Sequence, residues 1–487
     1  MKILILQLAR LGDIYMSWPA IRAVRRLYPQ AEIHFLTRPR FEGAVEGLTA
    51  VDKHHVLPSG HILEPLVTEG IHIEDSLNRM EEFTENLRAE NFDQIINLTF
   101  SPFSSYLTHA LTLPHTEVLG YTRFRDGYFC AADEISAYFY AQVGVNKANR
   151  VHVADIFASM LGVEYVEEDW AAPQLPELSM DLPQAYMAVH VGASEKHKAM
   201  SGAAWGRALD YFARRYQGLP IVLIGAPNEA SIAEEIIAQA TSATVINLVG
   251  QTRMAELFTV LKKAELLVGC DSAPIHMASL TDTPTLNISM GAVNFWETGP
   301  KATLGLIYRV EDSTQLVPER VGEIIAQLLE GVADPELIIR SAGLVSYSAN
   351  QENPTERFQW DLVQALYLGA PFPIADRIEV IEGAMKLNDI NDFLMSQFQL
   401  IPEKGVAAVA NFIASGEEVI KSISRLVPEL SPLMNWYHTE KIRVAPGTQE
   451  EICAATLSIH ERFKRHLRVY IPQEETTVRV EEKDGTL

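Results

Sequence analysis

The feature that most constrains this chain's fold is a regular alternation of apolar runs with segments of helical period. A strand predicted at residues 2–8 is followed by a helix at 14–27 and a second strand at 31–36. The same alternation then gives strands at 51–57 and 92–98, and helices at 76–90, after Pro102 and at 147–162. This order indicates a parallel sheet with helices on both of its faces.

The pattern repeats after an interruption. Residues 164–184 hold three prolines and an acidic cluster, which is typical of a solvated linker between domains. Beyond it the predicted strands are 185–194, 219–227, 243–250, 264–270 and 283–289, and the helices are 203–216, 228–240, 253–263 and a short one from 273. Two doubly wound sheets in tandem form a cleft at the carboxyl ends of their strands, where we expect small-molecule chemistry.

From about residue 331 the strand-like runs almost vanish and apolar residues recur at helical spacing. The predicted helices are 356–368, 376–399, 405–414, 417–427 and 448–469, and the segment 474–487 is a frayed acidic tail. Thr448 and Glu451 form a capping box for the last helix. At 487 residues the chain exceeds the roughly 250–300 residues of a single core. We therefore predict domains at 1–170, 185–330 and 331–487, the last an α-helical extension.

Charge and cysteine content exclude several classes of protein. The formal net charge is −23, from 40 Lys and Arg against 63 Asp and Glu, whereas binding to a phosphate backbone needs a basic excess. Nucleic acid is thus not an expected partner. The three cysteines show no CxxC spacing, which argues against a zinc knuckle or a disulfide framework and indicates a reducing compartment. Without a signal-peptide core or a membrane-length apolar run, the sequence predicts a cytoplasmic protein.

A small basic cluster leaves one question of partners open. Arg22, Arg25 and Arg26 share a predicted helix, and Arg38 and Arg40 follow soon after. These side chains can form a local surface for peripheral contact with the inner face of a membrane or with a phosphate. They can equally be solvated charges on helix and loop surfaces.

Three loops that follow predicted strands carry polar residues suited to chemistry. In the first, Gly12 and Asp13 stand where the opening strand gives way to a helix. Glycine permits a tight turn or a close backbone approach, and an aspartate there can either cap the helix or act in catalysis. The loop lacks GxGxxG, so a dinucleotide fingerprint is absent where a dehydrogenase would show it.

The second loop is "CDSAPIH", residues 270–276. Asp271 and Ser272 stand at the cap of a predicted helix, Pro274 is in its first turn, and His276 follows. A helix N-terminus with free amides, a hydroxyl and an imidazole is a ready site for an anion such as pyrophosphate. The alternative is that the two polar residues only cap the helix while the histidine packs on the sheet.

The third loop is "HVGASEKHK", residues 190–198. After small residues it presents Ser194, Lys196, His197 and Lys198. Lysines on such a loop can neutralise phosphate charge as a leaving group departs. They can also be ordinary loop charges.

Together the three stretches resemble the family 9 glycosyltransferases, whose best-known members are the ADP-heptose:lipopolysaccharide heptosyltransferases of the GT-B fold. The opening "LGDIYMSWPAIRAVRRLYP" looks like that family's strand-loop-helix beginning. "CDSAPIHMASLTDTPTLNISMG", followed by "ETGP", is similar to its Asp-Ser/Thr-Gly-x-x-His-x-Ala segment. "HVGAS" with a following lysine and Trp205 resembles its phosphate-facing loop. The likeness covers about 1–330.

The resemblance implies an α/β GT-B fold, two Rossmann-like doubly wound domains facing a cleft, and assigns roles residue by residue. Asp13, after Gly12, is the general base that deprotonates the acceptor hydroxyl, so that the anomeric carbon inverts in one displacement. Lys198, seven residues before Trp205, matches the family lysine better than Lys196 does. The implied donor-binding residues are Ser194, Lys196, Lys198, Asp271, Ser272, Ala273 and His276. Neither a metal nor another cofactor is implied.

Two positions depart from the family pattern. Ala273 stands where the family usually has glycine, and Met200 replaces the first aromatic residue after the lysine. A methyl group at position 273 lies where a diphosphate would approach the helix amides. The extension 331–487 has no counterpart in the short family members, and its role is open between binding a protein partner, a membrane or a second subunit.

The leading hypothesis is therefore an inverting, metal-independent glycosyltransferase. Its expected donor is a nucleotide-diphosphate sugar, with ADP-heptose as the first candidate, and its expected acceptor is a lipopolysaccharide-type or other cell-surface glycan or glycolipid. The alternative is a non-catalytic GT-B-shaped binding or scaffold protein that uses the helical extension for assembly. A nucleotide-sugar epimerase or dehydrogenase needs a dinucleotide loop that the sequence lacks.

Overall fold

The structure is a computed structural model that describes residues 1–68, 70–193, 195–291, 293–348 and 353–472. The chain forms two compact units, residues 1–352 and residues 353–487. The first unit contains two sheets. We call the first sheet with its helices the first lobe, and the second sheet with its helices the second lobe. The domain limits given above remain a prediction.

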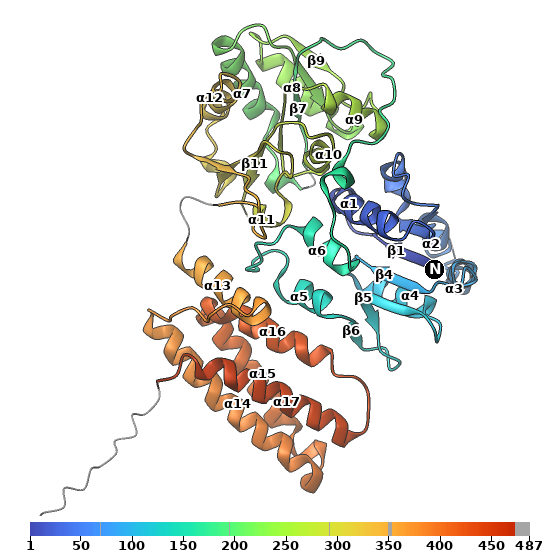
Figure 1. Ribbon diagram of the computed structural model, residues 1–487, viewed down its shortest axis with the longest axis vertical. Helices are drawn as coiled ribbons and strands as arrows, with labels where there is room; N and C mark the ends of the chain where they lie inside the picture. Colours follow the sequence, from blue (N-terminus) through green and yellow to red (C-terminus); the bar gives the residue numbers. More distant parts are fainter. Residues whose placement is uncertain (69, 194, 292, 349–352, 473–487) are drawn as a thin grey trace, which may run out of the picture. The chain divides into compact units, whose positions relative to one another are not determined.

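The first lobe is built on a sheet of six strands in the order β3-β2-β1-β4-β5-β6 (Figure 1). These are β1 (Lys2–Leu6), β2 (Glu32–Thr37), β3 (Lys53–Val56), β4 (Gln94–Asn97), β5 (Glu117–Arg123) and β6 (Phe129–Ala131). The neighbours are parallel except β6, which is antiparallel to β5. The continuous apolar run of β1 suits a strand that is buried on both faces.

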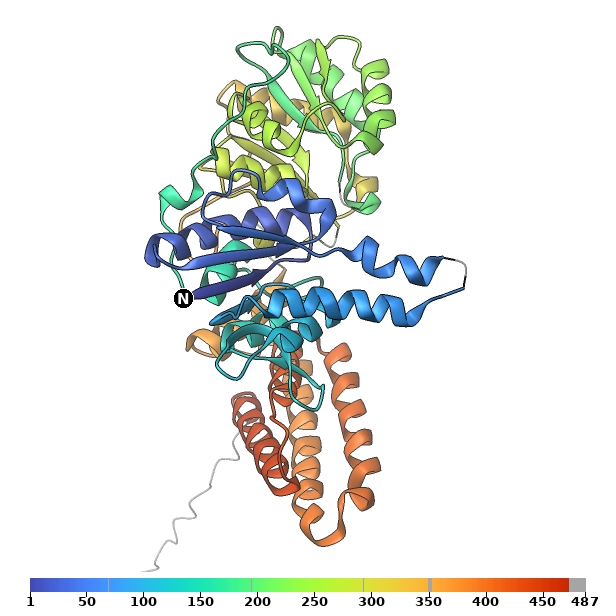
Figure 2. The same ribbon diagram turned by 90° about the vertical axis from the view of Figure 1, so that its right-hand side faces the viewer.

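Helices cover both faces of the first sheet. They are α1 (Leu11–Leu27), α2 (Ser59–Val67), α3 (Ile73–Arg88), α4 (Pro102–Leu111), α5 (Glu134–Gln142) and α6 (Val153–Met160). Leu4 and Leu6 of β1 share one core cluster with Ile62, Leu87 and Leu107 of α2, α3 and α4. The alternate side chains of β1 face α1 and α6, which pack against each other. Figure 2 shows α2 and α3 as a hairpin that projects from the lobe.

The second lobe has a sheet of seven strands in the order β13-β12-β11-β10-β7-β8-β9. They are β7 (Met187–His190), β8 (Ile221–Ile224), β9 (Val245–Asn247), β10 (Leu266–Cys270), β11 (Thr285–Met290), β12 (Gly305–Val310) and β13 (Leu337–Ile339). Only β13 pairs antiparallel among these described strands. The covering helices are α7 (Gly202–Arg215), α8 (Ala230–Gln239) and α12 (Pro318–Leu329) on one face, and α9 (Met254–Lys262) and α10 (Ala273–Thr281) on the other.

The strand orders place the predicted loops at the carboxyl ends of the strands that lie at each sheet's switch point. In the first sheet β1 lies between β2 and β4, and in the second β7 lies between β8 and β10, so each sheet reverses its direction of winding there. Ligands of such sheets bind outside the carboxyl ends of the strands at these switch points. Asp13 follows β1, Lys198 follows β7, and Asp271 follows β10 directly. The loops singled out from the sequence therefore leave the switch-point strands.

The second unit is a bundle of helices. Its helices are α13 (Pro354–Leu368), α14 (Ile378–Lys404), α15 (Val406–Leu426), α16 (Ser431–Ile442) and α17 (Gln449–Arg468). Its core includes Leu387, Leu394, Ile420, Tyr437 and Phe463. The capping box at the start of α17 is confirmed, since Thr448 and Glu451 exchange hydrogen bonds. The predicted acidic tail 474–487 lies outside the described residues.

Helix α15 corrects one prediction. The segments 405–414 and 417–427 were expected as two helices, but residues 406–426 form one helix that runs through Gly416. A Cβ atom at Gly416 would lie 2.6 Å from Leu394 Cδ2 of α14. This glycine therefore allows a close helix–helix approach and does not end the helix.

The expected helix 147–162 is shorter than predicted. It begins at Val153, because His152 is its N-cap and its ring accepts a hydrogen bond from the backbone N–H of Ala154 at 3.1 Å. Val151 instead forms an antiparallel bridge with Val345. Residues before 153 are therefore held in an extended conformation against the second lobe.

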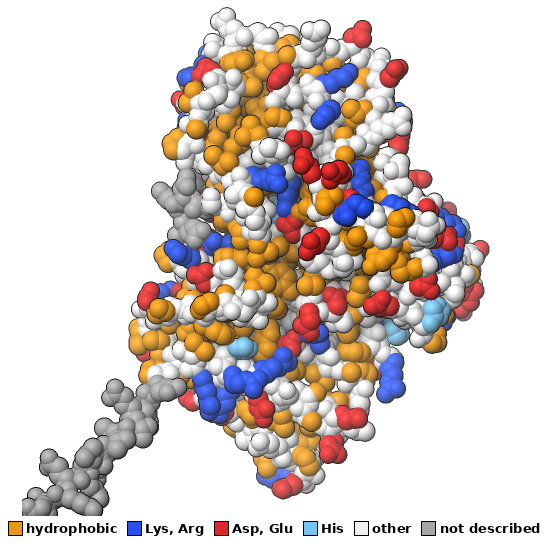
Figure 3. Space-filling model, in the orientation of Figure 1, with side chains coloured by type: hydrophobic (Ala, Val, Ile, Leu, Met, Phe, Trp, Pro, Cys, Tyr) orange, Lys and Arg blue, Asp and Glu red, His pale blue; other side chains and the backbone are white. Residues whose placement is uncertain are grey.

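Most residues of the linker 164–184 are exposed or half-buried, as expected of a solvated linker, but Asp169 and Pro173 are buried against the protein. Asp169 is buried and pairs with Arg26 at 2.9 Å, and Arg22 donates to the carbonyl of Ala171 at 2.6 Å. Two arginines considered for a membrane or phosphate contact thus bind groups of the protein itself. On the face drawn in Figure 3, acidic and basic side chains are interspersed with apolar ones. Within the described residues, no helix is both long and apolar enough to cross a membrane.

Candidate active site

Asp13 is the third residue of α1 and faces the second lobe. Its Oδ2 accepts a hydrogen bond from the backbone N–H of Arg10 at 2.9 Å, so the carboxylate does cap the start of the helix. Desolvation raises the pKa of Asp13, and the charge of Asp271 raises it further, while Arg10 and Lys198 oppose the rise. A carboxylate that is partly desolvated and only partly compensated is a stronger base than one in water.

Asp271 lies two residues before α10 and is held on both of its oxygens. Its Oδ1 accepts a hydrogen bond from the hydroxyl of Thr298 at 2.9 Å, and its Oδ2 lies 3.5 Å from the Nζ atom of Lys198. These contacts come from two other segments of the second lobe. The carboxylate is therefore fixed in direction at the mouth of β10.

Ser272 occupies the N-cap position of α10, yet its hydroxyl does not serve as a cap. It lies 2.9 Å from the carbonyl of Cys270 and 3.0 Å from Nδ1 of His190, and among the described residues no backbone amide of α10 donates to it. Ala273 is the first residue of the helix and Pro274 the second. Pro274 has no N–H, and the N–H of Ile275 donates to the carbonyl of Ser272 at 3.1 Å, so of these three residues Ala273 offers its backbone amide to an anion.

The lysine loop brings a cation to the same place. Lys198 is at the end of the short helix η3 (Lys196–Lys198), and its Nζ atom lies 3.9 Å from Glu195 as well as 3.5 Å from Asp271. Glu195 also pairs with Arg10 of the first lobe at 2.9 Å. Ser194 lies outside the described residues, and of Lys196 only the backbone is described. Among the predicted lysines, Lys198 is the one that the structure joins to Asp271.

Gly12 and His276 set the distance between the two turns. A Cβ atom on Gly12 would lie 2.8 Å from Cδ2 of the His276 ring, closer than real Cβ contacts. The ring is buried, and burial lowers the pKa of His276 to about 4. It is therefore neutral near pH 7 and can offer a hydrogen bond but no charge.

Several residues near the site were not singled out from the sequence. Glu297 and Thr298 belong to the single-turn helix α11 (Phe295–Thr298) and are the first two residues of the "ETGP" stretch, which was quoted for the family resemblance without a role for either residue. Glu297 is buried and accepts hydrogen bonds from Gly144 N at 3.0 Å and Asn149 Nδ2 at 3.1 Å, both in the first lobe. Glu229 lies 3.9 Å from Nε2 of His190. These residues act across large sequence separations, so no local pattern marks them.

One group of side chains outside the cleft has the donors of a metal site. His34, His55 and Glu90 of the first lobe place their ligand atoms within 4.8 Å of one another. Glu90, however, is paired with Lys2 at 3.0 Å and with Lys53, and the two imidazoles share a hydrogen bond of 2.9 Å. The donors are therefore already satisfied by protein partners, and the two lysines oppose a cation.

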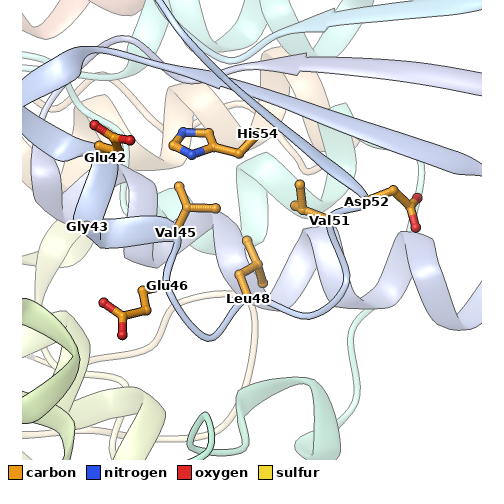
Figure 4. A pocket seen from close by; sticks show the side chains of 8 residues that line it. All are labelled: Glu42, Gly43, Val45, Glu46, Leu48, Val51, Asp52 and His54. Carbon is orange, nitrogen blue, oxygen red and sulfur yellow. The ribbon is translucent and has the colours of Figure 1, made fainter.

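The first lobe also has a hollow of about 440 Å³. It is lined by Glu42, Gly43, Val45, Glu46, Leu48, Val51, Asp52 and His54 (Figure 4). Within the described chain, none of the predicted catalytic or donor-binding residues lines it. The chemistry suggested by the sequence thus lies elsewhere, at the two strand-to-helix turns.

The turns together hold the groups needed for group transfer to a hydroxyl. Asp13 offers a basic carboxylate from the first lobe. Lys198 and the first turn of α10 offer positive charge and amide donors from the second lobe, where a leaving diphosphate would be stabilised. The arrangement can therefore remove a proton on one side of a reacting carbon and stabilise negative charge on the other.

Comparison with known proteins agrees with this chemistry. The family model described as Glycosyltransferase family 9 (heptosyltransferase) matches residues 80–304, which include Lys198, Asp271 and His276. Lipopolysaccharide heptosyltransferase 3 of Escherichia coli K12 is 24% identical over 310 residues, covering 58% of this chain and 81% of the relative. Lipopolysaccharide heptosyltransferase 1 of Campylobacter coli is 23% identical over 306 residues, covering 59% and 83%.

Solved structures show the same fold. A family 9 glycosyltransferase from Veillonella parvula aligns with a TM-score of 0.53 and 18% identity, covering 68% of this chain and 97% of its own. The ADP-heptose lipopolysaccharide heptosyltransferase II of E. coli aligns with a TM-score of 0.50 and 18% identity, covering 68% and 99%. The expected GT-B fold with a helical extension and the resemblance to glycosyltransferase family 9 are confirmed, and the chain is a glycosyltransferase.

Proposed function

We propose that this enzyme transfers a sugar from a nucleotide-diphosphate donor to a glycan hydroxyl with inversion at the anomeric carbon. The observation that supports this most directly is the meeting of Asp13, Lys198 and Asp271 at one place in the cleft. These residues follow three different switch-point strands in two lobes. A structural role for each alone would not require that they converge.

Asp13 is the proposed general base. It takes the proton of the acceptor hydroxyl while that oxygen forms its bond to the anomeric carbon, and the bond from that carbon to the diphosphate oxygen breaks on the opposite face. One displacement of this kind inverts the configuration. The raised pKa of Asp13 suits the role, since a base works best when its pKa approaches the working pH.

The second lobe is the proposed donor site. Lys198 and the amides of α10 stabilise the departing diphosphate, and Asp271 contacts the sugar or orients Lys198 toward it. Because charge stabilisation comes from a lysine and from amides, we propose a reaction that needs no metal. Transfer that is unchanged in excess EDTA supports this part, and loss of transfer with recovery on adding a divalent cation overturns it.

The relatives suggest the substrates. Those matched here are named lipopolysaccharide heptosyltransferases, and one solved relative is an ADP-heptose enzyme. We propose ADP-heptose as the first donor to test and a lipopolysaccharide-type glycan as the acceptor. Such an acceptor would place the enzyme in the cytoplasm, in peripheral contact with the inner face of the membrane.

The test is direct. Purified protein is mixed with ADP-heptose, with other nucleotide sugars and with lipopolysaccharide-type acceptors, and release of nucleoside diphosphate and the configuration of the product are measured. We expect release that depends on acceptor, a product of inverted configuration, and no release from Asp13→Ala with its circular dichroism unchanged. Full turnover by Asp13→Ala would remove Asp13 as the base.

A scaffold without catalysis is separated by ligand binding. The enzyme should be stabilised by a nucleoside diphosphate in a thermal-shift assay, because its donor site is intact. Lack of stabilisation by any nucleotide, together with no turnover, would favour the scaffold. The family match and the converging site residues favour the enzyme.

For the helical unit we propose contact with a protein partner or a second subunit. Phe393 and Phe412 lie edge to face at 6.4 Å and are 40% and 54% exposed, and Val419 and Leu426 follow at intervals of seven residues on α15. Light scattering of the full chain, compared with a Phe412→Ser/Leu426→Ser variant, tests self-association. A monomeric mass for the full chain at all concentrations excludes the second subunit, and an equal mass for both proteins excludes this surface as the contact.

A further inference from the structure

Helix α11 joins the two lobes at the donor carboxylate. Its last residue, Thr298, has one hydroxyl proton and two acceptors within reach, Asp271 Oδ1 at 2.9 Å and the carbonyl of Asn294 at 3.5 Å. The nearer acceptor is a carboxylate oxygen, and hydrogen bonds to carboxylates are stronger than those to a neutral carbonyl. Thr298 therefore donates to Asp271 and fixes one of its two oxygens.

The same short helix is attached to the first lobe. Glu297 accepts from Gly144 N and Asn149 Nδ2, and Asn294 Nδ2 donates to the carbonyl of Asn149 at 2.8 Å. The adjoining carbonyl of Gly299 lies 2.9 Å from Nε2 of His152. Since Nδ1 of that ring accepts from Ala154 N–H, Nε2 carries the proton and donates. α11 is thus held by the lobe that carries Asp13.

Asp271 needs such support because of its surroundings. Its negative charge acts on Asp13 across the cleft, and like charges favour side-chain arrangements that move them apart. With Oδ1 bound by Thr298, Oδ2 stays directed at Lys198. Without the hydroxyl, only the 3.5 Å contact with Lys198 would resist rotation of the carboxylate.

We infer that Thr298 is a positioning residue for the transfer reaction: its hydroxyl holds Asp271 in the orientation that the donor needs, and α11 makes that orientation depend on the docking of the first lobe. This inference rests on the proposed function. Thr298 touches neither reacting atom in this account. It acts through Asp271 alone.

The test uses isosteric variants and a matched control. Thr298→Val keeps the shape and removes the hydroxyl, whereas Thr298→Ser keeps the hydroxyl. Thr303→Val is the control, because Thr303 also donates to an aspartate of the second lobe, Asp282 at 3.2 Å, away from the cleft. For Thr298→Val we expect kcat/KM for the donor to fall by about tenfold to a hundredfold, the range for a lost hydrogen bond to a charged group. Thr298→Ser should keep most of the activity, and Thr303→Val all of it.

A double-mutant cycle separates positioning from general support of the fold. If Thr298 acts through Asp271, then Thr298→Val should change kcat/KM by less than about twofold when Asp271→Asn is already present. Equal losses in both backgrounds would overturn the inference. So would a Thr298→Val enzyme with wild-type kinetics.

Failure of the proposed function is recognised separately. If wild-type protein transfers no sugar, the proposed function fails, and crystal structures of the variants still decide the inference. We expect the Asp271 side chain to leave its position in Thr298→Val and to keep it in Thr298→Ser. An unmoved Asp271 carboxylate in Thr298→Val would overturn the positioning role whatever the activity.

Discussion

The β1–α1 turn and the β10–α10 turn each lead from a strand into a helix, but they differ in whether a side chain caps the start of that helix. At the β1–α1 turn the side chain of Asp13 bonds the backbone N–H of Arg10, so the helix is closed by its own carboxylate. At the β10–α10 turn the N-cap residue Ser272 directs its hydroxyl to Cys270 and His190, leaving the first turn without a side-chain cap among the described residues. The β1–α1 turn thus presents a base, and the β10–α10 turn presents donors for an anion.

The difference shows how a repeated strand-turn-helix unit takes on two roles. A carboxylate inside the first turn of a helix is stabilised by the N-terminal amides, which would oppose an incoming phosphate. Asp271 instead lies two residues before its helix, and the amide of Ala273 is left to a ligand. The position of one acidic residue relative to the helix start therefore separates the base from the donor site.

The largest effect is expected from substituting Asp13 at the β1–α1 turn. Asp13→Asn keeps an oxygen that can accept from Arg10 N–H but removes the base, so we expect transfer to fall by about 10²- to 10⁴-fold with the melting temperature little changed. Asp13→Ala also removes the cap, which costs about 1 kcal/mol of stability. Rates of diphosphate release and thermal melts check both. An asparagine variant as active as wild type would leave Asp13 with the capping role only.

The next largest effect concerns Glu297, which binds the first lobe near the β10–α10 turn. Burial raises the pKa of Glu297 to about 7 from an ordinary 4.5. The folded state therefore favours the protonated carboxyl, and stability is lost as pH rises from about 4.5 through about 7. At about 1.4 kcal/mol per tenfold change in proton affinity, the loss is on the order of 3 kcal/mol.

Glu297→Gln should remove this dependence. Melting temperatures of wild type and variant are compared between pH 5 and pH 8, so that other titrating groups cancel. We expect the wild type to lose stability relative to Glu297→Gln as the pH rises. Parallel curves would show that the carboxylate is stabilised in its charged form.

A smaller effect is expected at Gly12, where the β1–α1 turn lies close to His276 of α10. Gly12→Ala puts a methyl group against the His276 ring and should cost about 1–3 kcal/mol, as overpacking does, together with a loss of transfer activity. Gly60→Ala in α2 is the control, because within the described structure no atom lies within 4 Å of its added Cβ. Chemical denaturation and kinetics measure both variants. Equal stability and equal activity of the two variants would mean that the His276 ring moves aside at no cost.

The smallest effect compares two serines at N-cap positions. Ser201 caps α7 by accepting from Ala204 N at 3.2 Å, so Ser201→Ala should cost about 1 kcal/mol and leave the donor KM unchanged. Ser272→Ala should raise the donor KM by about twofold to tenfold, as loss of a neutral hydrogen bond does. A donor KM that is insensitive to Ser272→Ala would place the hydroxyl outside the donor site.

Local patterns were enough to find the strands and the residues at their ends. β1, β10 and the starts of α1 and α10 follow from apolar runs that end in polar caps, and Asp13 and Asp271 follow from their places after those runs. Lys198 was preferred to Lys196 through the family resemblance, by its spacing of seven residues from Trp205. Helix ends were less well predicted, because His152 is the N-cap of α6 and delays its start, and because Gly416 continues α15 against Leu394.

The contacts of α11 could not be found in this way. Within the second lobe Thr298 lies 27 residues from Asp271, and across the two lobes Glu297 lies 148 residues from Asn149. Such pairs depend on how distant segments and the two lobes pack together, which no periodicity of one segment encodes. Likewise Asp169 is an acidic residue in a proline-rich stretch, yet it is buried because Arg26 of α1 lies beside it.

The edge strands of both sheets have a consequence for the behaviour of the protein in concentrated solution. The edge strands β3, β6, β9 and β13 are four, three, three and three residues long. An unpaired edge is where another chain can add a strand by backbone hydrogen bonding, and short edges offer few such bonds. Within the described residues, the strands of both sheets therefore offer little exposed template for aggregation.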